Sequence, residues 1–79
     1  MEIEIRLFAT LQEYLPKGGS RYSSKLRVER GNTIKNVLNK LKIPKKIPKL
    51  LFVNGKQVNE DSILQPGDVI SIFPPVGGG

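Results

Sequence analysis

Hydrophobic and polar residues alternate in several short stretches of the chain, a pattern typical of strands with one buried face. Near the start, Ile3, Ile5 and Leu7 alternate with charged residues. A second alternating stretch covers residues 22–28, and we expect it to pair antiparallel with the first because the two are close in sequence. In residues 69–73 both alternating sets are largely apolar. We therefore expect this last strand to be central and buried on both faces.

One stretch has the periodicity of a helix instead. Its apolar residues recur at i, i+3, i+4 and i+7, and they are Ile34, Val37, Leu38 and Leu41. Asn32 or Thr33 is placed to cap the N-terminus of this helix. Pro44 and Pro48 follow the stripe, so the helix ends before them. The pattern predicts one main helix that turns an apolar face to a core.

Capping and turn residues predict the smaller elements. Thr10 and Glu13 have the spacing of a capping box, which predicts a short helix over residues 11–15. Asn54-Gly55 follows the apolar run 50–53 and is a strong hairpin signal, because both central turn positions require a positive φ. The hairpin predicts a short partner strand over residues 56–58.

The predicted element order is β-β-α-β-β-β, with a short extra helix after the first strand. One main helix can cover only one face of a sheet, so we expect an α+β fold with a mixed sheet of about five strands. The first and last strands can lie side by side and parallel in the middle of the sheet. That arrangement is a β-grasp. We expect one domain over residues 1–73 and a flexible tail over residues 74–79.

Composition removes several classes of function. The chain has 79 residues, which suits one small domain, and it contains neither Cys nor His. The missing residue types exclude a thiol nucleophile, a zinc finger and a histidine base, and we expect no metal site. No apolar run approaches 18 residues, so we expect no membrane span. The acidic start is unlike a signal peptide, and we expect a cytoplasmic protein.

The candidate chemistry lies in the last six residues, Pro-Pro-Val-Gly-Gly-Gly. Two prolines end the last strand, and six extended residues reach about 20 Å from the domain. Gly79 carries the terminal carboxylate, which is ionised at neutral pH. A carboxylate can attack the α-phosphate of ATP, and the acyl-adenylate can then be opened by a sulfur or nitrogen nucleophile. Only residues without side chains fit a narrow channel that leads to such a reaction. A frayed terminus is the alternative interpretation.

Four groups of residues carry a family resemblance. They are Leu7-Phe8-Ala9 before the short helix, the Asn54-Gly55 hairpin, Gly67-Asp68-Val69, and the ending Phe73-Pro74-Pro75-Val76-Gly77-Gly78-Gly79. With these residues the chain resembles the MoaD/ThiS family of sulfur carriers over its whole length. The ending is the most specific of the four. It resembles the small subunit of molybdopterin synthase more than the thiamine carrier.

The resemblance implies a ubiquitin-like β-grasp fold and a role as a carrier that is not an enzyme on its own. It implies that an E1-like adenylating enzyme activates Gly79 with ATP and Mg, and that a sulfur donor system converts it to a thiocarboxylate. The chain itself then needs no bound cofactor. The implied acceptor is a pterin precursor, reached when the tail enters the molybdopterin synthase large subunit. Gly77 and Gly78 thread the channel, and the docking segment matches Phe73, Pro74, Pro75 and Val76.

A lysine-rich stretch runs from Lys40 to Lys49, in a chain with 13 Lys and Arg against 7 Asp and Glu and a net charge of +6. It is either a solvated loop, the favoured interpretation, or a patch for nucleic acid or an acidic partner. No aromatic residue lies among these lysines, so nucleic acid is the disfavoured partner. The charge also departs from related carriers, which are often acidic.

Three further features have structural interpretations. We expect Phe8 in the core and Phe73 half exposed at the root of the tail. Glu60-Asp61 is expected in a polar loop that caps a helical turn at residues 62–64, not at a metal. Gly18-Gly19 is expected in a flexible loop, since no strand–loop–helix pattern surrounds it.

Three other functions remain open. The thiocarboxylate could serve thiamine, cysteine or tungsten-cofactor synthesis in place of molybdopterin. The activated tail could form an isopeptide bond with a lysine of another protein, which would make the chain a ubiquitin-like modifier. A plain β-grasp module that binds nucleic acid through its lysines is the remaining alternative, and it predicts a steep salt dependence.

Overall fold

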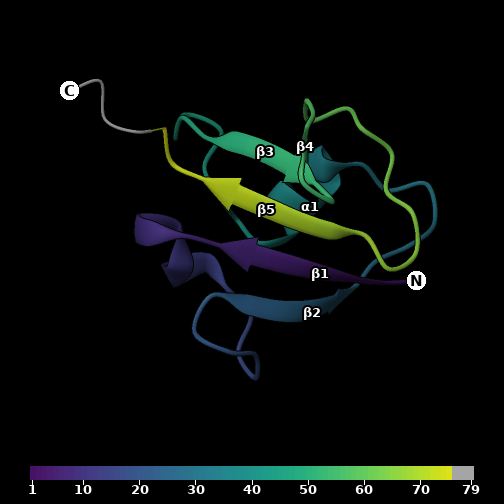
Figure 1. Cartoon of the computed structure of the whole chain (residues 1–79), viewed down its shortest axis with the longest axis horizontal. Helices are drawn as coiled ribbons and strands as arrows, with labels where there is room; N and C mark the ends of the chain where they lie inside the picture. Colours follow the sequence, from purple (N-terminus) through teal and green to yellow (C-terminus); the bar gives the residue numbers. More distant parts are fainter. Residues whose placement is uncertain (76–79) are drawn as a thin grey trace.

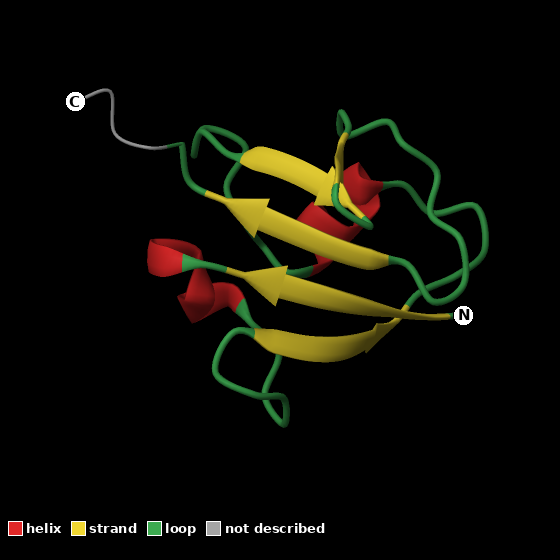
Figure 2. Ribbon diagram, in the orientation of Figure 1, coloured by secondary structure: helices red, strands yellow, loops and turns green. Residues whose placement is uncertain are grey.

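The computed structural model describes residues 1–75. These residues form a five-stranded sheet, one α-helix and one 3-10 helix (Figures 1 and 2). The elements along the chain are β1 (Glu2–Leu7), η1 (Ala9–Tyr14), β2 (Ser23–Arg27), α1 (Ile34–Lys40), β3 (Leu50–Val53), β4 (Lys56–Gln57) and β5 (Val69–Phe73). The predicted element order and the α+β class are confirmed. Two predicted strands are shorter than expected: Tyr22 and Val28 lie outside β2, and Val58 lies outside β4.

The strand order in the sheet is β2-β1-β5-β3-β4. The first and last strands, β1 and β5, lie side by side and run parallel, with Ile5 opposite Ile70. All other neighbours are antiparallel, so the sheet is mixed. This central parallel pair defines the β-grasp, as predicted. It also places Phe73, the last residue of β5, in the middle of one end of the sheet.

One face of the sheet, here called the inner face, is covered by α1 (Figure 1). Ile3, Ile5 and Leu7 of β1 are almost fully buried there, together with Ile70 and Ile72 of β5. The other face is the outer face. The outward residues of β5 are only half-buried, so the prediction that this strand is buried on both faces was wrong. A single helix cannot cover two faces of a sheet, and the outer face therefore stays accessible.

The two helices begin in different ways. Thr33 caps α1: its hydroxyl accepts from the Asn36 backbone N–H, and the Asn36 side chain accepts from the Thr33 backbone N–H in return. This reciprocal arrangement selects Thr33 over Asn32 as the cap. The predicted capping box of Thr10 and Glu13 does not form. The short helix starts after Phe8, has no side-chain cap and is a 3-10 helix.

The two predicted turns after β3 had different outcomes. Asn54 and Gly55 both have positive φ, of 52° and 84°, so the hairpin between β3 and β4 is the predicted tight turn. The helical turn expected over residues 62–64 is absent, and Ile63 instead forms a bridge with Thr33. Carbonyls of this loop, at Ser62 and Glu60, accept from the first backbone N–H groups of α1. Those N–H groups have no partner within a helix, which explains the extended loop. Within residues 1–75, no helix is long and apolar enough to cross a membrane.

Candidate functional site

Four aromatic side chains gather on the outer face, near the ends of β1 and β5. The Phe8 and Phe73 rings are stacked, with centroids 4.5 Å apart and planes 4° from parallel. Tyr22 stacks on Phe8 at 5.4 Å. Phe52 meets Phe73 edge to face at 5.5 Å. The ring faces therefore cover one another, and a nucleic-acid base would find few free ring faces on which to stack.

The alternation of side chains along the strands accounts for this cluster. Leu7 and Ile72 point into the core, so Phe8 and Phe73, one residue further along, point to the outer face. Phe52 follows the inward Leu51 in the same way. The Phe8 backbone N–H donates to the Ile72 carbonyl at 3.3 Å, which keeps Phe8 beside β5. The expectation that Phe8 lies in the core was wrong, whereas Phe73 is half-buried as expected.

An apolar depression of about 290 Å³ lies next to this cluster, lined by Leu50, Phe52, Phe73 and Pro74. We call the set Phe8, Leu50, Phe52, Phe73 and Pro74 the Phe73 surface. Leu50 and Phe52 come from β3 and Phe73 from β5, whereas Phe8 and Pro74 directly follow β1 and β5. Hydrogen bonds of the sheet hold the three strands in register. Pro75, the last described residue, is exposed. The Phe73 surface is thus a preformed apolar patch at the root of the C-terminal segment.

Sequence reasoning identified Phe73, Pro74 and Pro75 at this site, and the structure brings the first two together. The predicted site residues Val76, Gly77, Gly78 and Gly79 lie outside the described residues. The contributions of Leu50, Phe52 and Tyr22 were missed. The alternation of side chains along a strand could have shown that Phe52 faces outward, because it follows the core residue Leu51 just as Phe73 follows Ile72.

Charged groups follow on the outer face of β1, beginning at Arg6, two residues before Phe8. The Arg6 Nε atom donates to a Glu4 carboxylate oxygen at 2.6 Å, and Lys25 Nζ lies 3.8 Å from the other oxygen. The hydrogen bond from Arg6, and then the positive charges of Arg6 and Lys25, lower the pKa of Glu4, against the opposing effect of desolvation. Glu4 therefore stays ionised and serves as a partner for two cations, not as a proton donor.

Other hollows and acidic groups offer less. A wider hollow of about 770 Å³ lies beside Met1, but its amino group donates to the Val28 carbonyl at 2.7 Å, and Lys40 Nζ donates to the Arg27 carbonyl at 2.9 Å. Both positively charged groups are therefore already hydrogen-bonded to backbone carbonyls of the protein itself. In the part of the chain that the structure describes, no three Asp or Glu side chains converge as metal ligands would.

The fold and the site together define a class of protein: a ubiquitin-like β-grasp domain with a preformed apolar surface where its C-terminal segment leaves the sheet. The comparison with protein families agrees with this class. The ThiS family profile matches residues 5–79, so the chain belongs to the ThiS family, within the MoaD/ThiS type of ubiquitin-like sulfur carriers. The match includes the C-terminal residues that sequence analysis singled out.

Solved structures give the same architecture. SAMP1 from Haloferax volcanii is 25% identical, with all of both chains covered and a TM-score of 0.75. A second Haloferax volcanii protein is 31% identical, with 100% of this chain and 87% of that chain covered and a TM-score of 0.77. A chain in the complex of subunits 1 and 2 of molybdopterin-converting factor from Helicobacter pylori is 25% identical, with both chains fully covered and a TM-score of 0.66. No curated protein sequence matches the chain significantly.

Proposed function

We propose that this protein carries sulfur as a thiocarboxylate on Gly79 and donates it to a pterin precursor in molybdopterin biosynthesis. The observation that carries the proposal is the family match over residues 5–79, because it extends through a C-terminal Gly-Gly-Gly sequence. The similarity to a protein in a complex of molybdopterin-converting factor subunits supports the choice of acceptor. The position of the Phe73 surface, at the root of the segment that would react, supports a role in docking.

The proposed activation has two steps. A terminal carboxylate oxygen of Gly79 attacks the α-phosphorus of ATP, the bond to pyrophosphate breaks, and an acyl-adenylate forms. Hydrosulfide supplied by a sulfur donor system then attacks the terminal carbonyl carbon, the bond to AMP breaks, AMP leaves with the carboxylate oxygen, and a thiocarboxylate remains. An E1-like adenylating enzyme would hold ATP and Mg and supply the catalytic groups, since the chain has neither His nor Cys. The carrier itself would need no bound cofactor.

Each part of the C-terminal region has a role in this proposal. Phe73 and Pro74 belong to the apolar surface that the partner would cover, and Pro75 and Val76 continue the docking segment. Gly77 and Gly78 would pass through a channel too narrow for side chains. After loading, the same segment would enter the molybdopterin synthase large subunit and bring the sulfur to the pterin precursor. The proposed carrier is therefore the sulfur-donating subunit of a two-subunit complex.

Truncation tests the proposal. A chain that lacks Gly78 and Gly79 should fold as the full chain does, because the core residues all lie before Phe73. With the adenylating enzyme from the same organism, the full chain should support exchange of pyrophosphate into ATP and the truncated chain should not. Reactions without carrier provide the blank. Undiminished exchange and sulfur delivery by the truncated chain would contradict the proposal.

A modifier function is the second candidate, and one observation favours it. SAMP1, a small archaeal modifier protein, is similar to this chain over the full length of both. In this case a lysine amine of a target protein would attack the acyl-adenylate, and AMP would leave as an isopeptide bond forms. Conjugates of higher mass, in which tryptic digestion leaves residues 57–79 joined through Gly79 to a target lysine, would favour the modifier, since Lys56 is the last basic residue of the chain. Binding to a thiazole synthase, and not to a molybdopterin synthase large subunit, would instead favour a role in thiamine synthesis.

A further inference from the structure

The positive charge of this protein comes from one continuous part of the chain. Residues 30–59 contain eight Lys and Arg and no Asp or Glu, whereas the rest of the chain has five basic and seven acidic residues. The basic part comprises α1, β3, β4 and the loop that joins α1 to β3. Charge segregated in this way produces a positive potential on one region of the surface, not an even distribution over it.

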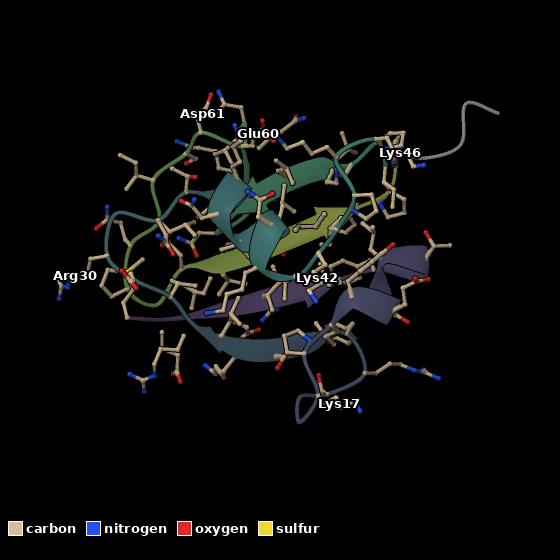
Figure 3. The ribbon with its side chains drawn as sticks, turned by 180° about the vertical axis from the view of Figure 1, so that it is seen from behind. Lys17, Arg30, Lys42, Lys46, Glu60 and Asp61 are labelled. Carbon is tan, nitrogen blue, oxygen red and sulfur yellow. The ribbon has the colours of Figure 1, made fainter. Side chains whose placement is uncertain are left out.

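Part of this basic region lies at the end of the sheet where the C-terminal segment leaves. Leu50 is opposite Phe73 in the antiparallel pairing of β3 with β5. Lys49, just before Leu50, and Pro74, just after Phe73, therefore leave the sheet at the same end. Lys45 and Lys46 precede them in the same loop and are both exposed. Figure 3 shows Lys46 at the end of the molecule where β3 begins.

The loop that carries these lysines has internal support. The Ile47 backbone N–H donates to the Pro44 carbonyl at 3.2 Å, and Lys49 Nζ donates to the same carbonyl at 3.3 Å. Within residues 1–75, the ion pairs formed by acidic side chains involve Glu4, Arg6 and Lys25, so Lys45 and Lys46 are not neutralised by such a pair. Glu60 lines the same hollow as Lys45 and Lys49, but within residues 1–75 no ion pair joins it to either lysine.

The opposite flank of the same exit has a different charge. The 3-10 helix η1, which follows β1, lies on the other side of the end of β5 from the loop before β3 (Figure 1). Residues 8–16 contain Glu13 and no Lys or Arg. The Phe73 surface, between these two flanks, is apolar. The end of the molecule is thus apolar at its centre and positive on the β3 side, whereas η1 on the β1 side carries a single charged residue, Glu13.

We propose that the adenylating enzyme has a matching acidic surface, which contacts Lys45 and Lys46 while the Phe73 surface is covered. This inference rests on the proposed function, because its partner is the enzyme that receives the tail. Charges at the rim of an interface accelerate association and fix the orientation of the partners. Here they would favour one orientation of the partner on the Phe73 surface. They would also offset the repulsion between the ionised end of the carrier and the phosphates of ATP.

Charge reversal at matched positions tests the inference. The first variant is Lys45→Glu with Lys46→Glu, and its control is Lys17→Glu with Lys35→Glu, which changes the net charge equally at exposed positions elsewhere. Lys17 lies far from Lys46 in Figure 3. The association rate constant and KM for the carrier are measured with the adenylating enzyme from the same organism, at ionic strengths from about 0.05 to 0.5 M. Thermal unfolding verifies that each variant is folded.

The Lys45/Lys46 variant should associate about tenfold more slowly at low salt, and the difference should disappear at high salt, where rim charges are screened. Its kcat should be unchanged, and the control should differ from the native chain by less than about twofold. Equal effects of the two variants would overturn this inference. If the native chain is still activated in the same assay, the proposed function stands. No activation of the native chain would overturn both. Normal activation of the Lys45/Lys46 variant, with loss of salt-dependent binding to a nucleic-acid duplex, would assign the lysines to nucleic acid instead.

Discussion

The stacked pair of Phe8 and Phe73 makes a quantitative prediction about stability. The two rings are 4.5 Å apart and nearly parallel, and both are half-buried on the outer face. An aromatic pair of this kind contributes about 0.5–1.5 kcal/mol beyond the area that it buries. If this contact holds the end of β5 to β1, the energies of the two residues should be coupled. Their coupling can be measured by a double-mutant cycle with Phe8→Leu and Phe73→Leu.

We expect each single substitution to lower the free energy of unfolding by about 1–2 kcal/mol, because leucine keeps some apolar contact and loses the stack. The double variant should be about 1 kcal/mol more stable than the sum of the single effects predicts. For a domain of this size, 1 kcal/mol corresponds to a change in Tm of about 4–8 °C. Urea unfolding followed by circular dichroism gives the free energies, and scanning calorimetry gives Tm.

A second cycle provides the control. Leu38 lies on α1, on the other side of the sheet from Phe73, so Phe73→Leu and Leu38→Ala should be additive within about 0.5 kcal/mol. A Phe8–Phe73 coupling as small as that of the control would refute the interpretation that stacking fixes the end of β5. The Phe73 surface would then not be a preformed patch at the root of the tail.

Three other predictions follow from single contacts. Asn54→Ala should lower the free energy of unfolding in urea by about 1–3 kcal/mol, because alanine disfavours the φ of 52° and cannot make the side-chain hydrogen bonds to Asp68 and the Val69 backbone N–H. An unchanged unfolding midpoint would count against this prediction. Gly19→Ala should lower the free energy of unfolding by about 1–3 kcal/mol, because a Cβ atom would lie 2.2 Å from the Ser23 carbonyl oxygen. Wild-type stability in the same urea experiment would show that the loop adapts freely. The Glu4 carboxyl should titrate below the ordinary glutamate pKa in an NMR pH series and shift upward in Arg6→Gln. Because its folded pKa is lowered, Glu4 stabilises the fold above the ordinary pKa and loses that effect as pH falls through the lowered value, and an unshifted midpoint in both proteins would contradict this.

Strand alternation and glycine chemistry were sufficient to predict most of the fold. The inward set of Ile3, Ile5 and Leu7 fixed the first strand, and the Asn54-Gly55 turn fixed the hairpin, because each depends on local rules. The failures involved tertiary context. Thr10 and Glu13 have the spacing of a cap, but the chain leaves β1 at Phe8 and turns directly into a 3-10 helix.

The candidate site was predicted only in part, for the same reason. Phe73 and Pro74 could be found from their position before the glycines. Phe52 and Leu50 come from another part of the sequence and reach the site only because β3 pairs with β5 in a particular register. Phe8 was expected in the core because it is hydrophobic. It points outward because it directly follows Leu7, which points inward, and side chains alternate along an extended chain. The sequence shows which residues are hydrophobic, but the pairing of the strands decides on which face of the sheet each of them lies.

The central claim is that Gly79 carries sulfur, and the mass of the intact protein tests it most directly. The purified chain is incubated with ATP, magnesium, the adenylating enzyme from the same organism and a sulfide source, and a known carrier is incubated in parallel with the same enzyme. We predict a mass increase equal to the exchange of one oxygen for sulfur, which fragmentation assigns to Gly79 and which disappears when ATP is omitted. An unchanged mass, in a reaction where the adenylating enzyme is shown to be active on another carrier, would contradict the account.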